Sequence, residues 1–174
     1  FLLAILILAG FALAYGESRT PPVVDTVVEG GAAAGAGLQP GDRIVAIGGT
    51  VTEIIYALGE GDRVVAVDTT SLYPPEATSK PNIGYVRQIS AEGVLSQKPD
   101  LIIAESGAGP IDSVNILKAS GLNFVSIPSP PETAAIPQKI RAVGQAIGRA
   151  EKAEELAKTV EASIKAIEEK VTAA

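Results

Sequence analysis

Tyrosine is the side chain of this sequence best suited to bind a metal-containing ligand. The 174 residues include four tyrosines and no histidine, cysteine or methionine. A phenolate oxygen is a hard donor that suits ferric iron, and tyrosine is a known proximal haem ligand. Tyr73 and Tyr85 lie in one long loop, and Arg87 is close enough in sequence to help hold a phenolate charged. The alternative interpretation is that both tyrosines are amphipathic surface side chains.

The missing residue types exclude several classes of protein. Without histidine or cysteine there is no zinc site of the usual kind, no disulfide and no Cys–His or Ser–His catalytic arrangement. The net charge of −6 and the absence of a basic run argue against nucleic acid as a partner. No nucleophile–base pair can be assembled, so the sequence does not predict an enzyme.

Two further patterns have ordinary structural explanations. Gly48 and Gly49 precede a predicted helix, but neither phosphate-loop spacing is present, so a tight turn is the preferred interpretation. Glu53 and Glu105 are isolated carboxylates near predicted helix starts, where the helix dipole favours them without any catalytic role.

After Pro40, apolar runs of strand length alternate with helical patterns. The predicted strands cover residues 43–47, 63–67, 101–104 and 124–127, and the predicted helices cover residues 50–58, 90–97, 111–119, 132–147 and 149–171. Continuously apolar strands separated by helices indicate a parallel sheet covered on both faces, an α/β fold with flanking helices that ends in a long helix. In the last helix, an apolar stripe runs from Leu156 to Val171.

In an open parallel sheet, ligands bind outside the carboxyl ends of the strands. The loop after the second strand is about twenty residues long, against the usual 2–6, which favours a binding role. The candidate ligand-pocket residues that join Tyr85 come from the loops after the strands: Gly49, Thr50, Thr69, Thr70, Tyr73, Arg87, Glu105, Ser106 and Gly107.

The N-terminal segment has a different composition. Residues 1–15 are uncharged and almost entirely apolar, which predicts a signal or membrane-anchor helix over residues 1–16. Either interpretation places the remaining residues outside the cytoplasm, in the periplasm or an equivalent compartment, secreted or anchored by residues 1–15. The composition of residues 17–41, rich in glycine, alanine and proline, is typical of a linker or a partial module.

From about residue 41 onward, the sequence resembles the haemin-binding periplasmic proteins of bacterial ABC importers, of the iron and cobalamin class. The matching stretches are RIVAIGGTVTEIIYALG at 43–59, VDTTS at 67–71, IGYVR at 83–87, SAEGVL at 90–95 and KPDLIIA at 98–104. In that family the tyrosine that binds ferric haem lies in a Gly-Tyr-x-Arg segment, which corresponds to Tyr85 here.

The resemblance implies a domain over residues 42–174 that is one Rossmann-like lobe of a periplasmic binding protein. It implies that the chain, or one lobe of it, carries haem b as ferric hemin to an inner-membrane permease and its ATPase. The second lobe looks absent, so a homodimer could cover the open face. Cobalamin and a ferric siderophore are alternative ligands for the same fold.

Residues 20–47 resemble part of a second family. PVVDTVVEGGAA at 22–33 and AGLQPGDRIVAI at 36–47 look like the PDZ domain of site-2-type membrane proteases. The zinc motif of such a protease cannot exist without histidine, and only half of a PDZ domain is matched. The sequence therefore suggests a fusion, with a peptide-binding or protease-regulating fragment as the alternative function.

Overall fold

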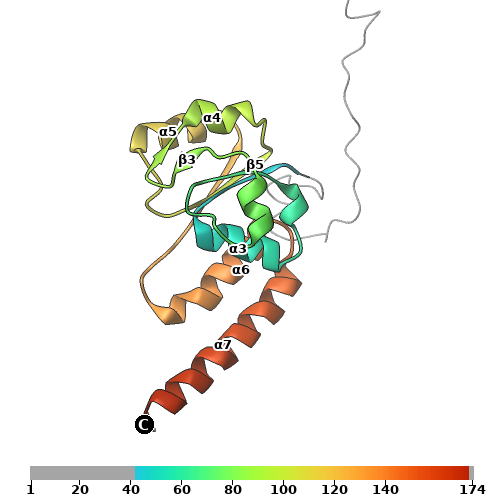
Figure 1. The fold of residues 1–174 in the computed structure, drawn as a ribbon, viewed down its shortest axis with the longest axis vertical. Helices are drawn as coiled ribbons and strands as arrows, with labels where there is room; N and C mark the ends of the chain where they lie inside the picture. Colours follow the sequence, from blue (N-terminus) through green and yellow to red (C-terminus); the bar gives the residue numbers. More distant parts are fainter. Residues whose placement is uncertain (1–41, 173–174) are drawn as a thin grey trace, which may run out of the picture.

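The computed structural model describes residues 42–172, which form a three-layered α/β lobe with one helix extending from it (Figure 1). The helix predicted over residues 1–16 and the linker or PDZ-like segment over residues 17–41 lie outside the described residues. Within residues 42–172, no helix combines the length and the apolar character needed to cross a membrane.

The centre of the lobe is a parallel sheet of four strands, as the sequence predicts. The strands are β1 (Ile44–Ile47), β2 (Val64–Val67), β5 (Leu101–Glu105) and β6 (Asn123–Ile127), in the spatial order β2-β1-β5-β6. From β1 the chain goes first to one side of the sheet and then, with β5, to the other. The crevice for a ligand is therefore expected beside the ends of β1 and β5.

Both faces of the sheet are buried, which explains why its strands are apolar at every position. Ile44 and Ala46 of β1 pack on one face, and Val45 and Ile47 pack on the other. The first face is covered by α3 (Gly49–Ala57), α6 (Ile136–Ala146) and α7 (Ala150–Thr172), and the second by α4 (Ala91–Ser96) and α5 (Ile111–Ala119). Figure 1 shows α4 and α5 above the sheet, and α3 and α6 below it.

The segment between β2 and α4 is more structured than the predicted loop. It contains a 3-10 helix over Pro75–Ser79 and a short antiparallel hairpin of β3 (Gly84–Tyr85) and β4 (Gln88–Ile89). Two buried isoleucines, Ile83 and Ile89, attach the hairpin to the core. Strands of two residues are too short to show a period, so the sequence could not reveal them.

Two helix starts can be compared with the sequence prediction. The side chain of Ser90 accepts a hydrogen bond from the backbone N–H of Gly93, which confirms it as the N-cap of α4. The helix predicted from residue 132 instead begins at Ile136, after a 3-10 turn over Thr133–Ala135. Pro137 in the first turn of α6 lacks a backbone N–H and has a fixed φ, and both properties suit a helix start.

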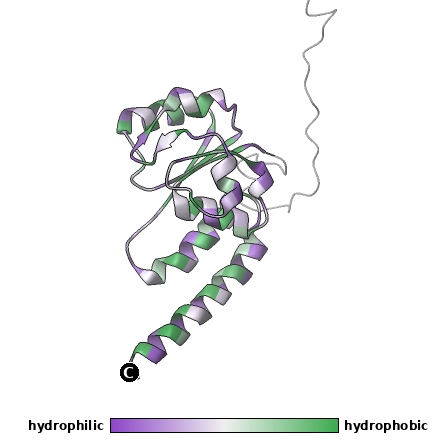
Figure 2. Cartoon of the chain, in the orientation of Figure 1, coloured by the Kyte–Doolittle hydropathy of each residue, from purple (hydrophilic) through white to green (hydrophobic). Residues whose placement is uncertain are grey.

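Helices α6 and α7 pack closely in the first half of α7. A Cβ atom added to Gly144 would overlap the Cβ of Ala153, so only glycine allows this approach. Arg141 of α6 pairs with Glu154 at 2.6 Å and Glu161 at 2.9 Å on α7. Beyond α6 the apolar stripe of α7 continues without cover, because Ile167 and Val171 are exposed (Figure 2).

A buried carboxylate fixes the turn between α6 and α7 to the rest of the lobe. Glu60, which follows α3, accepts hydrogen bonds from Arg149 at 2.6 Å and Arg63 at 3.2 Å. Arg63 also donates to the carbonyl of Ile147 at the end of α6. These contacts set the direction in which α7 leaves the lobe.

The close approach at Gly144 gives a first prediction. We expect Gly144→Ala to lower the free energy of unfolding by about 1–3 kcal/mol, because the added methyl group must push α6 away from Ala153. Chemical denaturation monitored by circular dichroism measures the change. Gln145→Ala, at the exposed neighbouring position, is the control, with a change within about 0.5 kcal/mol. Equal stabilities of the two variants would contradict the packing argument.

Candidate functional site

Asp68, the residue after β2, holds together the loops at the carboxyl edge of the sheet. Its side chain is buried and accepts hydrogen bonds from the backbone N–H groups of Gly48 (2.8 Å) and Thr70 (3.0 Å). The hydroxyls of Thr70 (2.6 Å) and Ser71 (2.9 Å) donate to the same carboxylate. Because Gly48 follows β1, Asp68 ties the end of β1 to the loop after β2.

The same contacts decide between the two interpretations of the Gly48-Gly49 pair. The N–H of Gly48 is used by Asp68, and the N–H of Gly49 donates to Thr70 Oγ1 at 3.0 Å. A Cβ atom on Gly49 would lie 2.6 Å from the carbonyl oxygen of Thr70. The glycines therefore make a tight turn whose N–H groups are already bonded within the protein, and this favours the turn over a phosphate-binding loop.

Backbone hydrogen bonds hold the Tyr85 hairpin between two strand-end loops. On one side, Thr69 N donates to Gly84 O at 2.9 Å. On the other side, Gly109 N donates to Val86 O at 2.9 Å, in the loop that follows β5. Tyr85 is thereby placed at the carboxyl edge of the sheet, next to the loops that follow β2 and β5.

The hairpin presents a phenol and a cation to the surface. The Tyr85 side chain is 47% exposed, although neighbouring Ile83 and Ile89 are buried. The side chain of Arg87, in the turn of the hairpin, is exposed and forms no hydrogen bond or ion pair with any other described residue. Leu72 and Tyr73, in the loop after β2, are also largely exposed. This edge therefore combines apolar, phenolic and cationic surface.

On the β5 side, Glu105 belongs to an almost buried polar cluster. Lys139 Nζ of α6 donates to Glu105 Oε1 at 2.6 Å and to Ser129 Oγ at 2.6 Å, and Ser129 Oγ donates to Glu105 Oε1 at 2.8 Å. Burial raises the pKa of the Glu105 carboxyl. Hydrogen bonds from Lys139, Ser129 and Thr50, together with the Lys139 charge, outweigh burial, so this pKa lies below its usual value.

The remaining candidates lie beside this cluster. Ser106 Oγ accepts a hydrogen bond from Ser129 N at 3.0 Å, and Gly107 has no atom near its missing Cβ and faces open space. Gly48 explains why the ends of β1 and β5 can meet, since a Cβ there would lie 2.9 Å from Glu105 Oε2. The structure thus brings the sequence-predicted candidates to one edge of the sheet.

Three residues of this edge were not among the predicted site residues: Asp68 and Ser129, which lie in loops after predicted strands, and Lys139. Lys139 carried a detectable signal, because Ile136, Lys139, Ile140 and Val143 share the i, i+3, i+4, i+7 spacing of a buried helix face. A lysine on such a face needs a partner. Its partner, Glu105, is distant in sequence and could not be identified without the fold.

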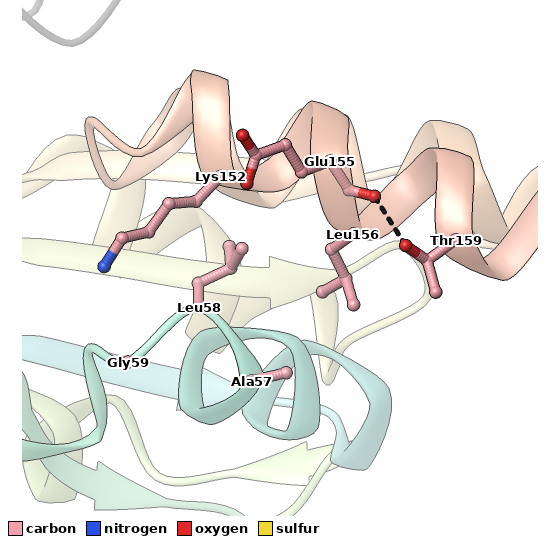
Figure 3. Close-up of a pocket in the computed structure, with 7 residues that line it drawn as sticks. All are labelled: Ala57, Leu58, Gly59, Lys152, Glu155, Leu156 and Thr159. Atoms are coloured by element: carbon pink, nitrogen blue, oxygen red, sulfur yellow. Dashed lines mark hydrogen bonds between the residues drawn. The ribbon is translucent and has the colours of Figure 1, made fainter.

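A groove elsewhere on the lobe is not part of this edge. It has a volume of about 400 Å³ and lies between the end of α3 and the first turns of α7, lined by Leu58, Lys152 and Leu156 among others (Figure 3). Gly49 is the first residue of α3, and the groove is at the opposite end of this nine-residue helix. The Thr159 hydroxyl is bonded to the Glu155 carbonyl of the same helix turn, and the charged side chains of Lys152 and Glu155 also line the groove.

The polar groups of the described part of this edge bear on whether it could hold a metal ion or supply a base. The described residues contain no group of acidic, histidine or cysteine side chains that could hold a metal ion directly. Ser129 lies beside a lysine, but the ammonium group of Lys139 is held in a 2.6 Å ion pair with Glu105, so it is not a free base. Among the described residues of this edge, the phenols of Tyr73 and Tyr85 and the guanidinium of Arg87 are exposed to solvent.

Comparison with known proteins gives the same fold. The chain is 47% identical to the periplasmic heme-binding protein RhuT from Roseiflexus sp. RS-1 in its apo form, with a TM-score of 0.70 over 72% of this chain and 48% of that one. It is 34% identical to the ABC transporter substrate-binding lipoprotein YvrC of Bacillus subtilis, over 74% of this chain and 41% of YvrC. The vitamin B12-binding protein of Vibrio cholerae is 38% identical over 49% of this chain and 31% of its own length.

The chain therefore spans about half the length, or less, of these relatives. A PDZ domain profile matches residues 6–73, and the described part of that range forms β1, α3, β2 and the loop after it. A periplasmic binding protein profile matches residues 44–174, including all of the sheet and its helices. This chain belongs to the periplasmic binding protein family.

Proposed function

We propose that the chain binds ferric haem as the substrate-binding component, or one lobe of it, of a bacterial ABC importer, with the Tyr85 phenolate as iron ligand. The observation that carries this proposal is the position of Tyr85. Its phenol is exposed at the carboxyl edge, on a hairpin fixed by backbone hydrogen bonds on both sides. A ligand atom held rigidly before binding loses little entropy when the complex forms.

The surroundings of Tyr85 suit a flat, largely apolar anion. Leu72 and Tyr73 supply exposed apolar and aromatic surface, on which a porphyrin ring can pack. Arg87, which is exposed and has no ion pair among the described residues, can attract the carboxylates of a ligand. Heme binding by RhuT, which shares nearly half of its aligned residues with this chain, supports the same ligand class.

The partners and the location in this proposal are those of substrate-binding proteins of ABC importers. The proposed partners are an inner-membrane permease and its ATPase, and the proposed site of action is the periplasm or its equivalent, reached through residues 1–16. We place the boundary of the binding lobe at residue 42. The homodimer suggested by the sequence stays a prediction.

Cobalamin is the second candidate ligand. The vitamin B12-binding protein of Vibrio cholerae is 38% identical over 85 residues, and the structure of the BtuF protein from that organism superposes with a TM-score of 0.64. Cobalamin carries its own cobalt ligands and makes no use of a phenolate. The two ligands therefore differ in their dependence on Tyr85.

The first test is a titration with hemin of the wild type, Tyr85→Phe and Tyr73→Phe. We expect the wild type to show the visible absorption of a ferric phenolate, and Tyr85→Phe to lose it. Affinity should fall by more than about tenfold in Tyr85→Phe, because even the outer-shell partners of metal ligands cost about 10–100-fold when removed. Tyr73→Phe is the control and should keep the spectrum. An unchanged spectrum in Tyr85→Phe would remove that residue from its role.

A second test moves the hairpin without touching the phenol. Gly84 has φ +104, and a Cβ there would lie 2.7 Å from the carbonyl oxygen of Gln88. Gly84→Ala should cost about 1–3 kcal/mol of unfolding free energy through backbone strain and should also weaken hemin binding.

Gly121→Ala is the matched control for this test. Gly121 has φ +80 with open space around the missing Cβ, in the turn before β6. It should lose similar stability and keep its hemin affinity. Equal hemin affinities of the two variants, measured by absorption titration, would show that the hairpin does not position the ligand.

A third test separates the two ligands. Cyanocobalamin added at equal concentration should leave the hemin spectrum of the wild type unchanged. Its direct affinity, measured by calorimetry, should be the same in the wild type and in Tyr85→Phe. Displacement of hemin by cyanocobalamin would favour the second candidate.

A further inference from the structure

Lys139 is the one lysine of the described carboxyl edge whose charge is buried, and the proposed function gives it no role. Only 9% of its side chain is exposed, and its ammonium group contacts Glu105 and Ser129. Lysine is almost never buried in this way unless it is paired. The ion pair fixes Lys139 in place. However, a buried ion pair is often no more stabilising than two apolar side chains, so stability alone does not explain why one is found at the end of β5.

The position of the ion pair gives a reason. Glu105 is the last residue of β5, and its side chain extends over Gly48 at the end of β1. This is the point between β1 and β5 where the strand order reverses and a ligand is expected. The loop that starts at Glu105 reaches Gly109, which bonds to the Tyr85 hairpin at Val86 and Ile89. Glu105 therefore begins the loop that holds the hairpin, and its charge lies on the same edge of the sheet as Tyr85.

The carboxylate itself is fixed by the fold. It bonds to Ser129, which orients the segment after β6, and its low pKa keeps it ionised at neutral pH. Without compensation, a negative charge at the ligand edge would repel a ligand that carries carboxylates. In a partly buried site, such repulsion is screened much less than in water.

We propose that Lys139 is a positioning and charge-compensating residue of the ligand site, which makes the β5 side of the edge electrically neutral so that a ligand bearing carboxylates can lie across it. The inference rests on the proposed function, because it takes the dianionic porphyrin as ligand. The inference adds a residue that affects ligand selectivity from below the surface. Lys139 belongs to α6 and acts on the ligand indirectly, by neutralising the charge of Glu105. Ser129 completes the arrangement by holding both charges in a fixed geometry.

The test compares hemin with hemin dimethyl ester, which has the same iron and ring but no propionate charge. Both are titrated in the same mixed solvent into the wild type, Lys139→Met, Glu105→Gln and Glu105→Gln/Lys139→Met. We expect Lys139→Met to weaken hemin binding about tenfold, because the uncompensated charge of Glu105 would then repel the propionates of hemin. Binding of the uncharged ester should change by no more than about twofold. The double variant, again neutral, should regain wild-type selectivity between the two ligands.

Two further variants keep the result interpretable. Lys152→Met removes the same charge from the groove at the far end of α3 and should leave both affinities unchanged. Glu105→Gln leaves Lys139 unopposed and should strengthen hemin binding a few-fold but not ester binding, which gives a readout even if Lys139→Met fails to fold. Thermal unfolding of each variant checks its folding.

The outcomes separate the two proposals. Equal weakening of hemin and ester in Lys139→Met, or no gain for hemin in Glu105→Gln, would assign Lys139 a structural role alone and overturn the inference, with hemin binding through Tyr85 intact. A wild type that binds neither ligand would overturn the proposed function, and this inference with it.

Discussion

The buried carboxylate of Asp68 is the constraint on which the carboxyl edge of the sheet depends. The hydrogen bonds between the strands of a parallel sheet stop where the strands end. Backbone N–H and C=O groups beyond that point need other hydrogen-bond partners, most of all in a sheet that is covered on both faces. Asp68 supplies these partners for the turn after β1 and for the loop after β2 at once. It is located directly after β2, so the sheet itself determines where the carboxylate lies. The hydrogen bonds of Asp68 therefore fix both loops relative to the strands that precede them.

A second carboxylate extends this arrangement to the other half of the edge. Glu105 does for β5 and the segment after β6 what Asp68 does for β1 and β2, but one of its hydrogen-bond donors is a cation, the ammonium group of Lys139. Lys139 comes from α6, and α6 packs against α7 through Gly144 and Arg141. The carboxyl edge and the helix that leaves the lobe therefore both contact α6.

The regular elements were predictable because they carry a long-range period or a continuous apolar run. The four strands of the sheet, the N-cap at Ser90 and the long helix over 150–172 match such patterns. The hairpin at Tyr85 could not be predicted, since its two-residue strands are defined by contacts with Thr69 and Gly109 and not by their own sequence. The Lys139–Glu105 pair was hidden for the same reason. Its members are 34 residues apart, and only the fold brings them together. That Tyr85 is the proposed ligand came from family resemblance, and no periodicity would have selected it over Tyr73.

The candidate residues divide into two groups according to whether their polar atoms are already used. Gly49, Thr70 and Glu105 are bonded to other parts of the protein and serve as the framework. Tyr85 and Arg87 are exposed, and both belong to the segment between β2 and α4. That segment rests on the sheet through backbone hydrogen bonds and two buried isoleucines, so its exposed side chains can be exchanged without disturbing the framework. A lobe built in this way can change its ligand by changing a few side chains on one hairpin. In the function proposed above, the hairpin, more than the sheet, therefore determines which ligand is bound.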